Sequence, residues 1–256
     1  METILKIIRL SSIELCIGVV CLLGCKSNND EIPIIEDESK TQVEEVKPPV
    51  PVDEDEPLDI PFIWRKNIEL TATEQQMSEK ANTFAFNLLK TVYADKEEKD
   101  KNILLSPLSA TLALSMVNNG ASGATGEEIR QTLGFSDVSS EDINLYAQKM
   151  VSAMQTLDPR GKFESANSIW IQNNFPVLGA FKQVNQQYYD AEIQNVDFTL
   201  PATLQTINNW ISEKTYGMIP EILKDMNPQT RMLLGNTLFF NGYWFEPFNK
   251  DLLIFV

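Results

Sequence analysis

Residues 102–135 constrain the fold more than any other part of the chain, because strand, helix-start and helix-end signals follow one another closely there. The short apolar run 102–105 predicts a strand. Ser106 and Pro107 then form a helix start, in which the serine caps the first turn and the proline stands where its missing N–H costs nothing. Apolar residues cover nearly every side of the following helix, 108–117, so we expect this helix to be buried.

A glycine-rich turn separates this helix from the next one. Gly120 is expected to end the buried helix in the left-handed conformation that glycine adopts readily. Thr125 and Glu128 have the spacing of a capping box at the start of the following helix. Gly134 is expected to end that helix in the same way.

Two longer helices are predicted on either side of this region. Thr73 and Gln76 have capping-box spacing at the start of the first, whose apolar residues recur every three or four positions to Val92. Ser139 and Asp142 start the second, which also carries an apolar stripe. Each is expected to pack one face on a core.

The hydrophobic period changes after residue 160, which indicates strands mixed with helices. Residues 163–172 predict a strand with Ile169 and Ile171 on one face and Trp170 on the other. A helix over 176–189, a strand over 192–198 and a helix from Pro201 are expected next. The nearly continuous apolar run 231–241 is typical of a strand buried on both faces. The sequence therefore predicts an α+β fold, with helices packed over one large, mostly buried sheet.

The composition excludes most catalytic chemistries. The 256 residues contain no histidine, and Cys16, Cys21 and Cys25 are the three cysteines. Histidine-dependent nucleophiles, histidine metal ligands and disulfides in the rest of the chain are thereby excluded. A net charge of −15 argues against nucleic-acid binding. We expect no enzyme, no cofactor and no small-molecule substrate, although a metal site built from carboxylates alone is left open.

The first 25 residues have the order of an export signal. Lys6 and Arg9 precede the apolar run 13–23, and Leu-Leu-Gly-Cys follows, ending at Cys25. That ending resembles a bacterial lipobox, in which the cysteine becomes the lipid-modified first residue of the mature protein. The alternative, a membrane-spanning helix, needs about 20 apolar residues, more than the run supplies. We therefore expect an exported protein with a lipid on Cys25, anchored at the outer membrane or cell surface.

Residues 26–61 are acidic and contain almost no aromatic side chains. Twelve acidic residues stand against three lysines, so this stretch carries −9 of the net charge of −15. Such a composition buries too little apolar surface to offset the entropy of ordering, which predicts a disordered tether. A calcium-binding acidic patch is the less favoured alternative. Residues 62–256 would then form the globular domain.

Five blocks of the sequence resemble the serpin family and occur in that family's order. Ser106, Pro107 and Ser109, preceded by Asn102, match N-x-x-x-S-P-x-S. The other four are G-A-x-G-x-T at 120–125, A-N-S-I-W at 166–170, I-N-N-W-I at 207–211 with Thr215, Gly217 and Ile219, and N-T-L-F-F-N-G-Y-W at 236–244 with Phe248.

The resemblance implies roles for four structural residues, and none of the four is catalytic. It assigns Ser106, Ser109 and Asn236 to a polar cluster beneath the main sheet, called the shutter. It assigns Trp244 to the breach, where the reactive loop of a serpin first enters the sheet. Hydroxyl and amide groups in an apolar interior must bond one another or reduce stability. Ordinary roles, as helix cap for Ser106 and core filler for Trp244, are compatible with these assignments.

The resemblance implies an inhibitor of serine or cysteine peptidases, with the target protease as its partner. In serpins, the protease attacks an exposed loop that then inserts into the sheet. The printed sequence ends at Val256, before the part that matches this loop, and holds no reactive-site bond. We therefore expect residues 62–256 to be an incomplete serpin domain that is inactive by itself. The alternatives are a non-inhibitory surface lipoprotein that binds partners at an open sheet edge, and a non-functional gene fragment.

Overall fold

The computed structural model describes residues 13–17, 21–22, 67–95, 102–159 and 161–242. Its helices are α2 (Ala72–Tyr93), α3 (Pro107–Asn118), α4 (Gly123–Leu133), α5 (Ser140–Gln155), α6 (Gly179–Tyr189) and α7 (Pro201–Lys214). Its strands are β1 (Ile13–Ile17), β2 (Cys21–Leu22), β3 (Lys162–Gln172), β4 (Glu192–Val196) and β5 (Met232–Asn241). Among these residues, no helix is both long and apolar enough to cross a membrane.

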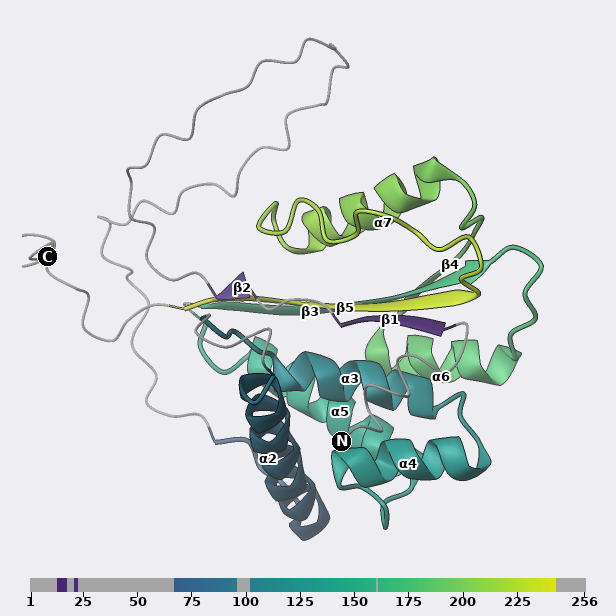
Figure 1. Cartoon of the computed structure of the whole chain (residues 1–256). Coiled ribbons are helices and arrows are strands. Elements are labelled where there is room, and N and C mark those ends of the chain that lie inside the picture. The colour runs from purple at the N-terminus through teal and green to yellow at the C-terminus, as the bar shows by residue number, and fades with distance from the viewer. Residues whose placement is uncertain (1–12, 18–20, 23–66, 96–101, 160, 243–256) are drawn as a thin grey trace, which may run out of the picture.

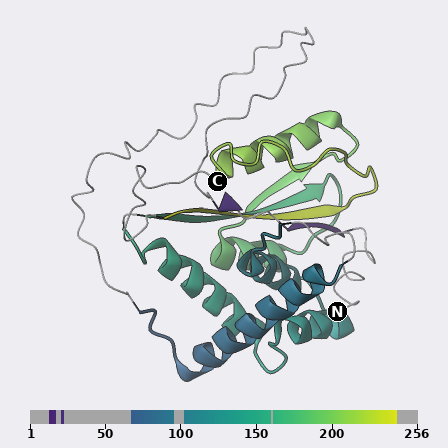
Figure 2. The ribbon, with the colours of Figure 1, turned by 60° about the vertical axis from the view of Figure 1, so that its left-hand side comes forward.

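One sheet separates two layers of helices (Figure 1). The strand order is β1-β5-β3-β4, and β2 also pairs with β5. β5 and β3 are antiparallel, from Lys162 opposite Asn241 to Ile171 opposite Met232. Figure 1 and Figure 2 show α7 on one face of the sheet and α2, α3, α4, α5 and α6 on the opposite face. The α+β architecture, with helices over a mostly buried sheet, is therefore confirmed.

The two faces of the sheet have separate cores. On the face toward α3, Ile169 and Ile171 pack with Leu112 and Met116. On the face toward α7, Trp170 meets Trp210 edge to face, with ring centroids 6.3 Å apart. The predicted alternation along residues 163–172 is confirmed, as is the burial of the 231–241 strand on both faces.

A third core lies between the helices farther from the sheet. It joins α2, α4 and α5 around Phe135, which is fully buried and packs edge to face on Tyr146. Gly134 ends α4 at φ 79°, the left-handed C-cap expected from the sequence. Ser139 caps α5 through a hydrogen bond from the Asp142 N–H, also as expected.

Four local predictions were wrong. The capping box of α2 is Thr71 with Glu74 rather than Thr73 with Gln76, because in the fold the Glu74 carboxylate also accepts a charged hydrogen bond from Lys149. α4 begins at Gly123 and does not use the predicted Thr125 and Glu128 box. Gly120 does not adopt the positive φ that was predicted. A glycine is needed there because a Cβ would lie only 2.9 Å from Cδ2 of Phe181. Residues 102–105 are irregular and pair with no strand in the described part of the chain.

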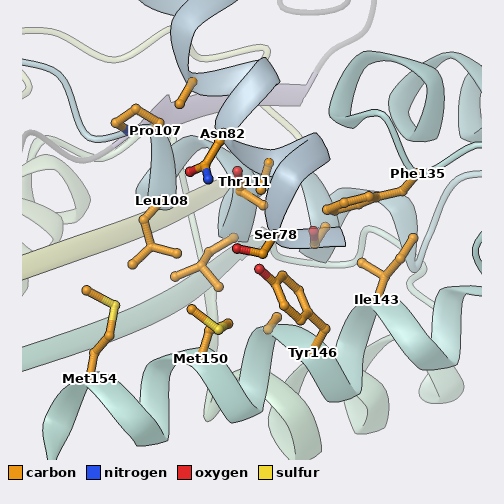
Figure 3. Close-up of a pocket in the computed structure, with 15 residues that line it drawn as sticks. Ser78, Asn82, Pro107, Leu108, Thr111, Phe135, Ile143, Tyr146, Met150 and Met154 are labelled. Atoms are coloured by element: carbon orange, nitrogen blue, oxygen red, sulfur yellow. The ribbon is translucent and has the colours of Figure 1, made fainter. Parts of the chain in front are cut away.

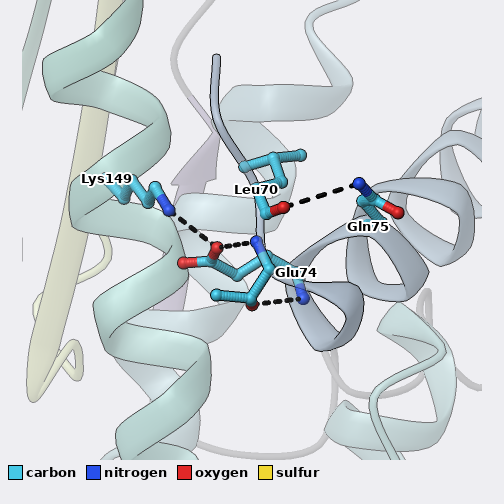
Figure 4. Close-up of polar contacts among 5 residues, drawn as sticks. Leu70, Glu74, Gln75 and Lys149 are labelled. Atoms are coloured by element: carbon cyan, nitrogen blue, oxygen red, sulfur yellow. Dashed lines mark hydrogen bonds and ion pairs between the residues drawn. The ribbon is translucent and has the colours of Figure 1, made fainter.

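Glu74 is the polar centre of the α2 start (Figure 4). Its carboxylate accepts hydrogen bonds from Lys149 Nζ at 2.7 Å and from the Thr71 N–H at 2.7 Å. These two donors hold the pKa of Glu74 below its ordinary value of 4.5. A carboxyl group whose pKa is lower in the folded than in the unfolded chain stabilises the fold at pH values above its unfolded pKa. This stabilisation is lost as the pH falls through the pKa of the folded state.

Replacing Glu74 with glutamine is therefore expected to destabilise the fold in a pH-dependent way. The loss at pH 7 should be about 1 kcal/mol, as for a helix cap combined with a partly exposed ion pair. It should be smaller at pH 3 than at pH 7, because the wild-type carboxylate takes up protons as the pH falls through its lowered pKa. Urea denaturation at both pH values measures this, with Glu79→Gln, an exposed change on the same helix, as the control. Equal losses at pH 3 and pH 7 would contradict the assignment.

Candidate functional site

The candidate site is a buried polar cluster where β3 and β5 face α3, α5 and α6. Asn236 is fully buried in β5 and lies directly opposite Asn167 of β3. Its Nδ2 donates to Asn167 Oδ1 at 2.8 Å and to Ser165 Oγ at 3.3 Å. Asn167 in turn donates to the backbone carbonyl of Tyr189 at 2.7 Å. The central strand pair is thereby tied to the end of α6.

A second layer of amides continues the cluster into the helices. The Tyr189 hydroxyl donates to Asn144 Oδ1 at 2.6 Å. Asn144 and Asn119 exchange two hydrogen bonds, at 2.9 and 3.0 Å. Asn119 also donates to Asn185 Oδ1 at 3.1 Å, and Asn185 donates to the Phe181 carbonyl at 3.1 Å. Burial raises the pKa of Tyr189, so this hydroxyl stays neutral and remains a donor at physiological pH.

The predicted shutter residues lie at the start of α3 and on β5. Ser106 caps α3, where its Oγ accepts a hydrogen bond from the Ser109 N–H at 3.1 Å. Ser109 faces the interior and has no measurable exposure. Within the described part of the chain, Ser109 Oγ and Asn236 Oδ1 have no hydrogen-bond partner. Their shutter role therefore stays a prediction, and Cys25 and Trp244 lie outside the described residues.

Sequence reasoning missed the amides on the helices. Asn119, Asn144 and Asn185 were not singled out, although asparagine in or beside an apolar helix stretch is a usable signal. Most buried polar groups are hydrogen-bonded, so a buried amide predicts a partner on another element. The partners here lie 25 and 66 positions away from Asn119 in the sequence, and no local pattern reports such distances.

The opposite face of the sheet explains the glycine in the central strand. A Cβ on Gly235 would lie 2.8 Å from Ser168 Oγ, which accepts a hydrogen bond from Trp170 Nε1 at 3.0 Å. The glycine therefore leaves room for a polar contact beneath α7. Trp210 on that helix donates to Glu192 Oε2 at 3.0 Å and so joins α7 to β4.

Lys214 strengthens this link between α7 and β4. Its Nζ lies 2.6 Å from Glu192 Oε1. Burial by itself raises the pKa of Glu192, but the hydrogen bonds from Lys214 and Trp210 outweigh it and lower the pKa overall. The carboxylate is therefore charged at neutral pH and helps to hold the helix against the sheet.

A cavity of about 210 Å³ lies between α2, α3 and α5 (Figure 3). Its wall is mostly apolar, and the Ser78 and Tyr146 hydroxyls point toward each other across one side. Burial raises the pKa of Tyr146. The lining contains no Asp, Glu, Lys or Arg, and no group of three or more His, Cys, Asp or Glu that could hold a metal occurs in the described residues. The cavity thus offers volume but no pair of groups for acid–base chemistry.

Comparison with known protein families gives one match, over residues 79–253, to the model described as "Serpin (serine protease inhibitor)". Among curated proteins, Serpin B6 of Bos taurus is 36% identical over 182 residues, which cover 68% of this chain and 47% of the relative. Serpin-Z2A of Triticum aestivum is 32% identical over 189 residues, which cover 70% and 46% respectively. The chain therefore spans about half the length of the curated relatives it matches.

Solved structures agree with this match. Tengpin, a thermophilic serpin, in its latent state is 35% identical, with a TM-score of 0.63 over 73% of this chain and 48% of that structure. Reactive-loop-cleaved human thyroxine-binding globulin is 31% identical, with a TM-score of 0.65 over 70% of this chain and 53% of that structure. Most of this chain therefore shares its fold with about half of each of these structures.

Proposed function

Because the chain belongs to the serpin family, we propose that the protein it comes from inhibits serine or cysteine peptidases while anchored to the bacterial cell envelope. The matched family is described as that of serine protease inhibitors. The observation that carries the proposal is the family match over residues 79–253, together with the intact β3–β5 core that it covers.

The polar cluster would hold the β3–β5 pair in one register while the sheet of an inhibitor takes up a further strand. Asn236 and Asn167 bond to each other across the central strand pair, and Tyr189 continues the link to α6. Amides in a dry interior are costly unless paired, so they favour one register of the strands over others. The unpartnered Ser109 Oγ and Asn236 Oδ1 give this core acceptors for a further donor.

The envelope anchor is proposed from the sequence alone. The run 13–23 and the Leu-Leu-Gly-Cys ending supply the signal, and Cys25 would carry the lipid. Residues 26–61, with their excess of acidic side chains, would then serve as the tether that holds the inhibitor away from the membrane surface. A protease that reaches the envelope would meet the inhibitor there.

The proposal is tested on the protein isolated from its own cells. We expect its intact mass to show a lipid on Cys25. If the chain extends past Val256 with a reactive loop, we also expect it to form a complex with a serine or cysteine peptidase that survives denaturing electrophoresis. The 256 residues alone are expected to form no such complex, because they hold no match to the loop. A Cys25→Ser variant is the control for the anchor, and it should appear in the soluble fraction.

Two results would count against the proposal. A mature protein without lipid would remove the envelope anchor but leave inhibition standing. A longer protein that is degraded by every peptidase tested, with no stable complex, would remove inhibition but leave the anchor standing. The two parts of the proposal therefore fail separately.

A non-inhibitory binding module is the second candidate function. One observation favours it: the edge of β5 that faces away from β3 accepts the added strands β1 and β2. A lipoprotein of this kind would capture an extended peptide segment by adding it to the sheet.

A further inference from the structure

The edge of β5 that faces away from β3 is covered by residues from the start of the chain (Figure 1). β1 lies parallel to β5, from Ile13 opposite Met232 to Ile17 opposite Asn236. β2 continues along the same strand, with Cys21 opposite Phe239 and Leu22 opposite Phe240. These residues belong to the apolar stretch interpreted above as the export signal.

The two pairings follow β5 in one direction with a single change of register. Four positions separate Ile17 from Cys21, whereas three separate their partners Asn236 and Phe239. β1 also contacts α3, so the added strand is held by the sheet edge and by the helix layer beneath it.

The edge would be a liability without such a cover. β5 has ten residues, of which Met232 through Phe239 are buried, and a strand edge presents a row of unpaired N–H and C=O groups. Residues 13–17, Ile-Glu-Leu-Cys-Ile, are mostly apolar and include β-branched side chains, which favours a strand. The apolar character needed for export therefore also suits strand pairing.

We propose that residues 13–17 and 21–22 pair within the chain, before processing, as strands that cover the β5 edge, and that cleavage ahead of Cys25 uncovers this edge. The uncovering step rests on the lipoprotein processing proposed above; the pairing in the unprocessed chain does not. An export signal that is paired with β5 in a folded sheet cannot engage the export machinery. Export therefore has to precede this pairing. The β5 edge then becomes free only in the processed protein.

A thiol cross-link tests the pairing in the full, unprocessed chain. Cys16→Ser and Cys25→Ser leave Cys21 as the native thiol and also block lipid attachment. Phe239→Cys then places a second thiol opposite Cys21, and neighbouring strands lie about 4.8 Å apart, within the Cα separation that a disulfide allows. After oxidation we expect an intramolecular disulfide between the two positions, identified by mass spectrometry of the linked peptides.

Phe240→Cys in the same background is the matched control. Residue 240 is opposite Leu22, and adjacent strand residues point to opposite faces, so its thiol should link to Cys21 at a roughly tenfold lower yield. Equal yields at positions 239 and 240, or no link at position 239 in a chain that retains its circular dichroism, would overturn the proposal.

A second measurement leaves β5 unaltered, in case Phe239→Cys does not fold. Leu15→Pro removes an N–H in the middle of β1, and proline is poorly tolerated inside a sheet. Backbone amides of β5 should then exchange with solvent at least about tenfold faster, whereas those of β4 should not change. Ile34→Pro, in the predicted tether, is the control. Unchanged exchange in β5 after Leu15→Pro overturns the proposal, whether or not Cys25 proves to be lipidated.

Discussion

Replacing Trp170 with alanine is expected to lower the free energy of unfolding by about 3–5 kcal/mol, the range measured for large aromatic residues removed from protein cores. Trp170 is 1% exposed and fills the space between the sheet and α7. The variant would lose its edge-to-face contact with Trp210 and leave Ser168 Oγ without the indole donor. Urea denaturation of the full chain, followed by circular dichroism, measures the loss.

Two companion variants separate packing from hydrogen bonding. Trp170→Phe keeps much of the ring but removes the N–H, so its loss should be smaller, on the order of 1–2 kcal/mol. Phe240→Ala, at a side chain that is 45% exposed at the end of β5, should cost less than about 1 kcal/mol. A loss for Trp170→Ala no greater than that for Phe240→Ala would contradict the assignment of the α7 face as a core.

The sequence was sufficient to predict the architecture because periodicity is a local property. The alternation of Ile169, Trp170 and Ile171 placed each side chain on its correct face, and the run 231–241 revealed a strand buried on both faces. The serine caps at Ser106 and Ser139 were also predicted, since a cap depends on residues only three positions apart.

Local patterns failed where two candidates competed within a few residues. Thr71 with Glu74 and Thr73 with Gln76 both have capping-box spacing, and the choice depends on Lys149, which lies 75 positions from Glu74. Gly120 was assigned a backbone role, but the reason for a glycine there is the ring of Phe181. Contacts between distant residues decided both cases, and spacing alone contains no information about them.

The candidate site was predicted only in outline for the same reason. Family motifs indicated Ser106 and Ser109 at the start of α3 and Asn236 on β5, two elements that contact each other. They did not indicate that Asn144 and Tyr189 extend the cluster away from the sheet. A buried amide predicts that a partner exists, but identifying the partner requires the fold.

Replacing Asn144 with alanine is the second change with a large expected effect. Asn144 is 3% exposed, accepts hydrogen bonds from Asn119 and Tyr189, and donates one back to Asn119. Its removal leaves the Tyr189 hydroxyl, in a side chain that is 5% exposed, without its acceptor. We expect a loss of about 2–4 kcal/mol in the free energy of unfolding, because a buried donor without a partner pays its full desolvation cost.

A double-mutant cycle with Tyr189→Phe tests whether that loss comes from the network. Tyr189→Phe alone should cost about 1–2 kcal/mol, and the double variant should cost at least about 1 kcal/mol less than the sum of the single losses, since the orphaned hydroxyl is gone. Asn87→Ala, an exposed change on α2, controls for the helix propensity that alanine adds in both helices. Additive losses would mean that the Tyr189–Asn144 hydrogen bond contributes nothing, and the cluster would then be a set of separate buried amides. Coupled losses would instead show that the layer joining β3 to α5 and α6 acts as one unit.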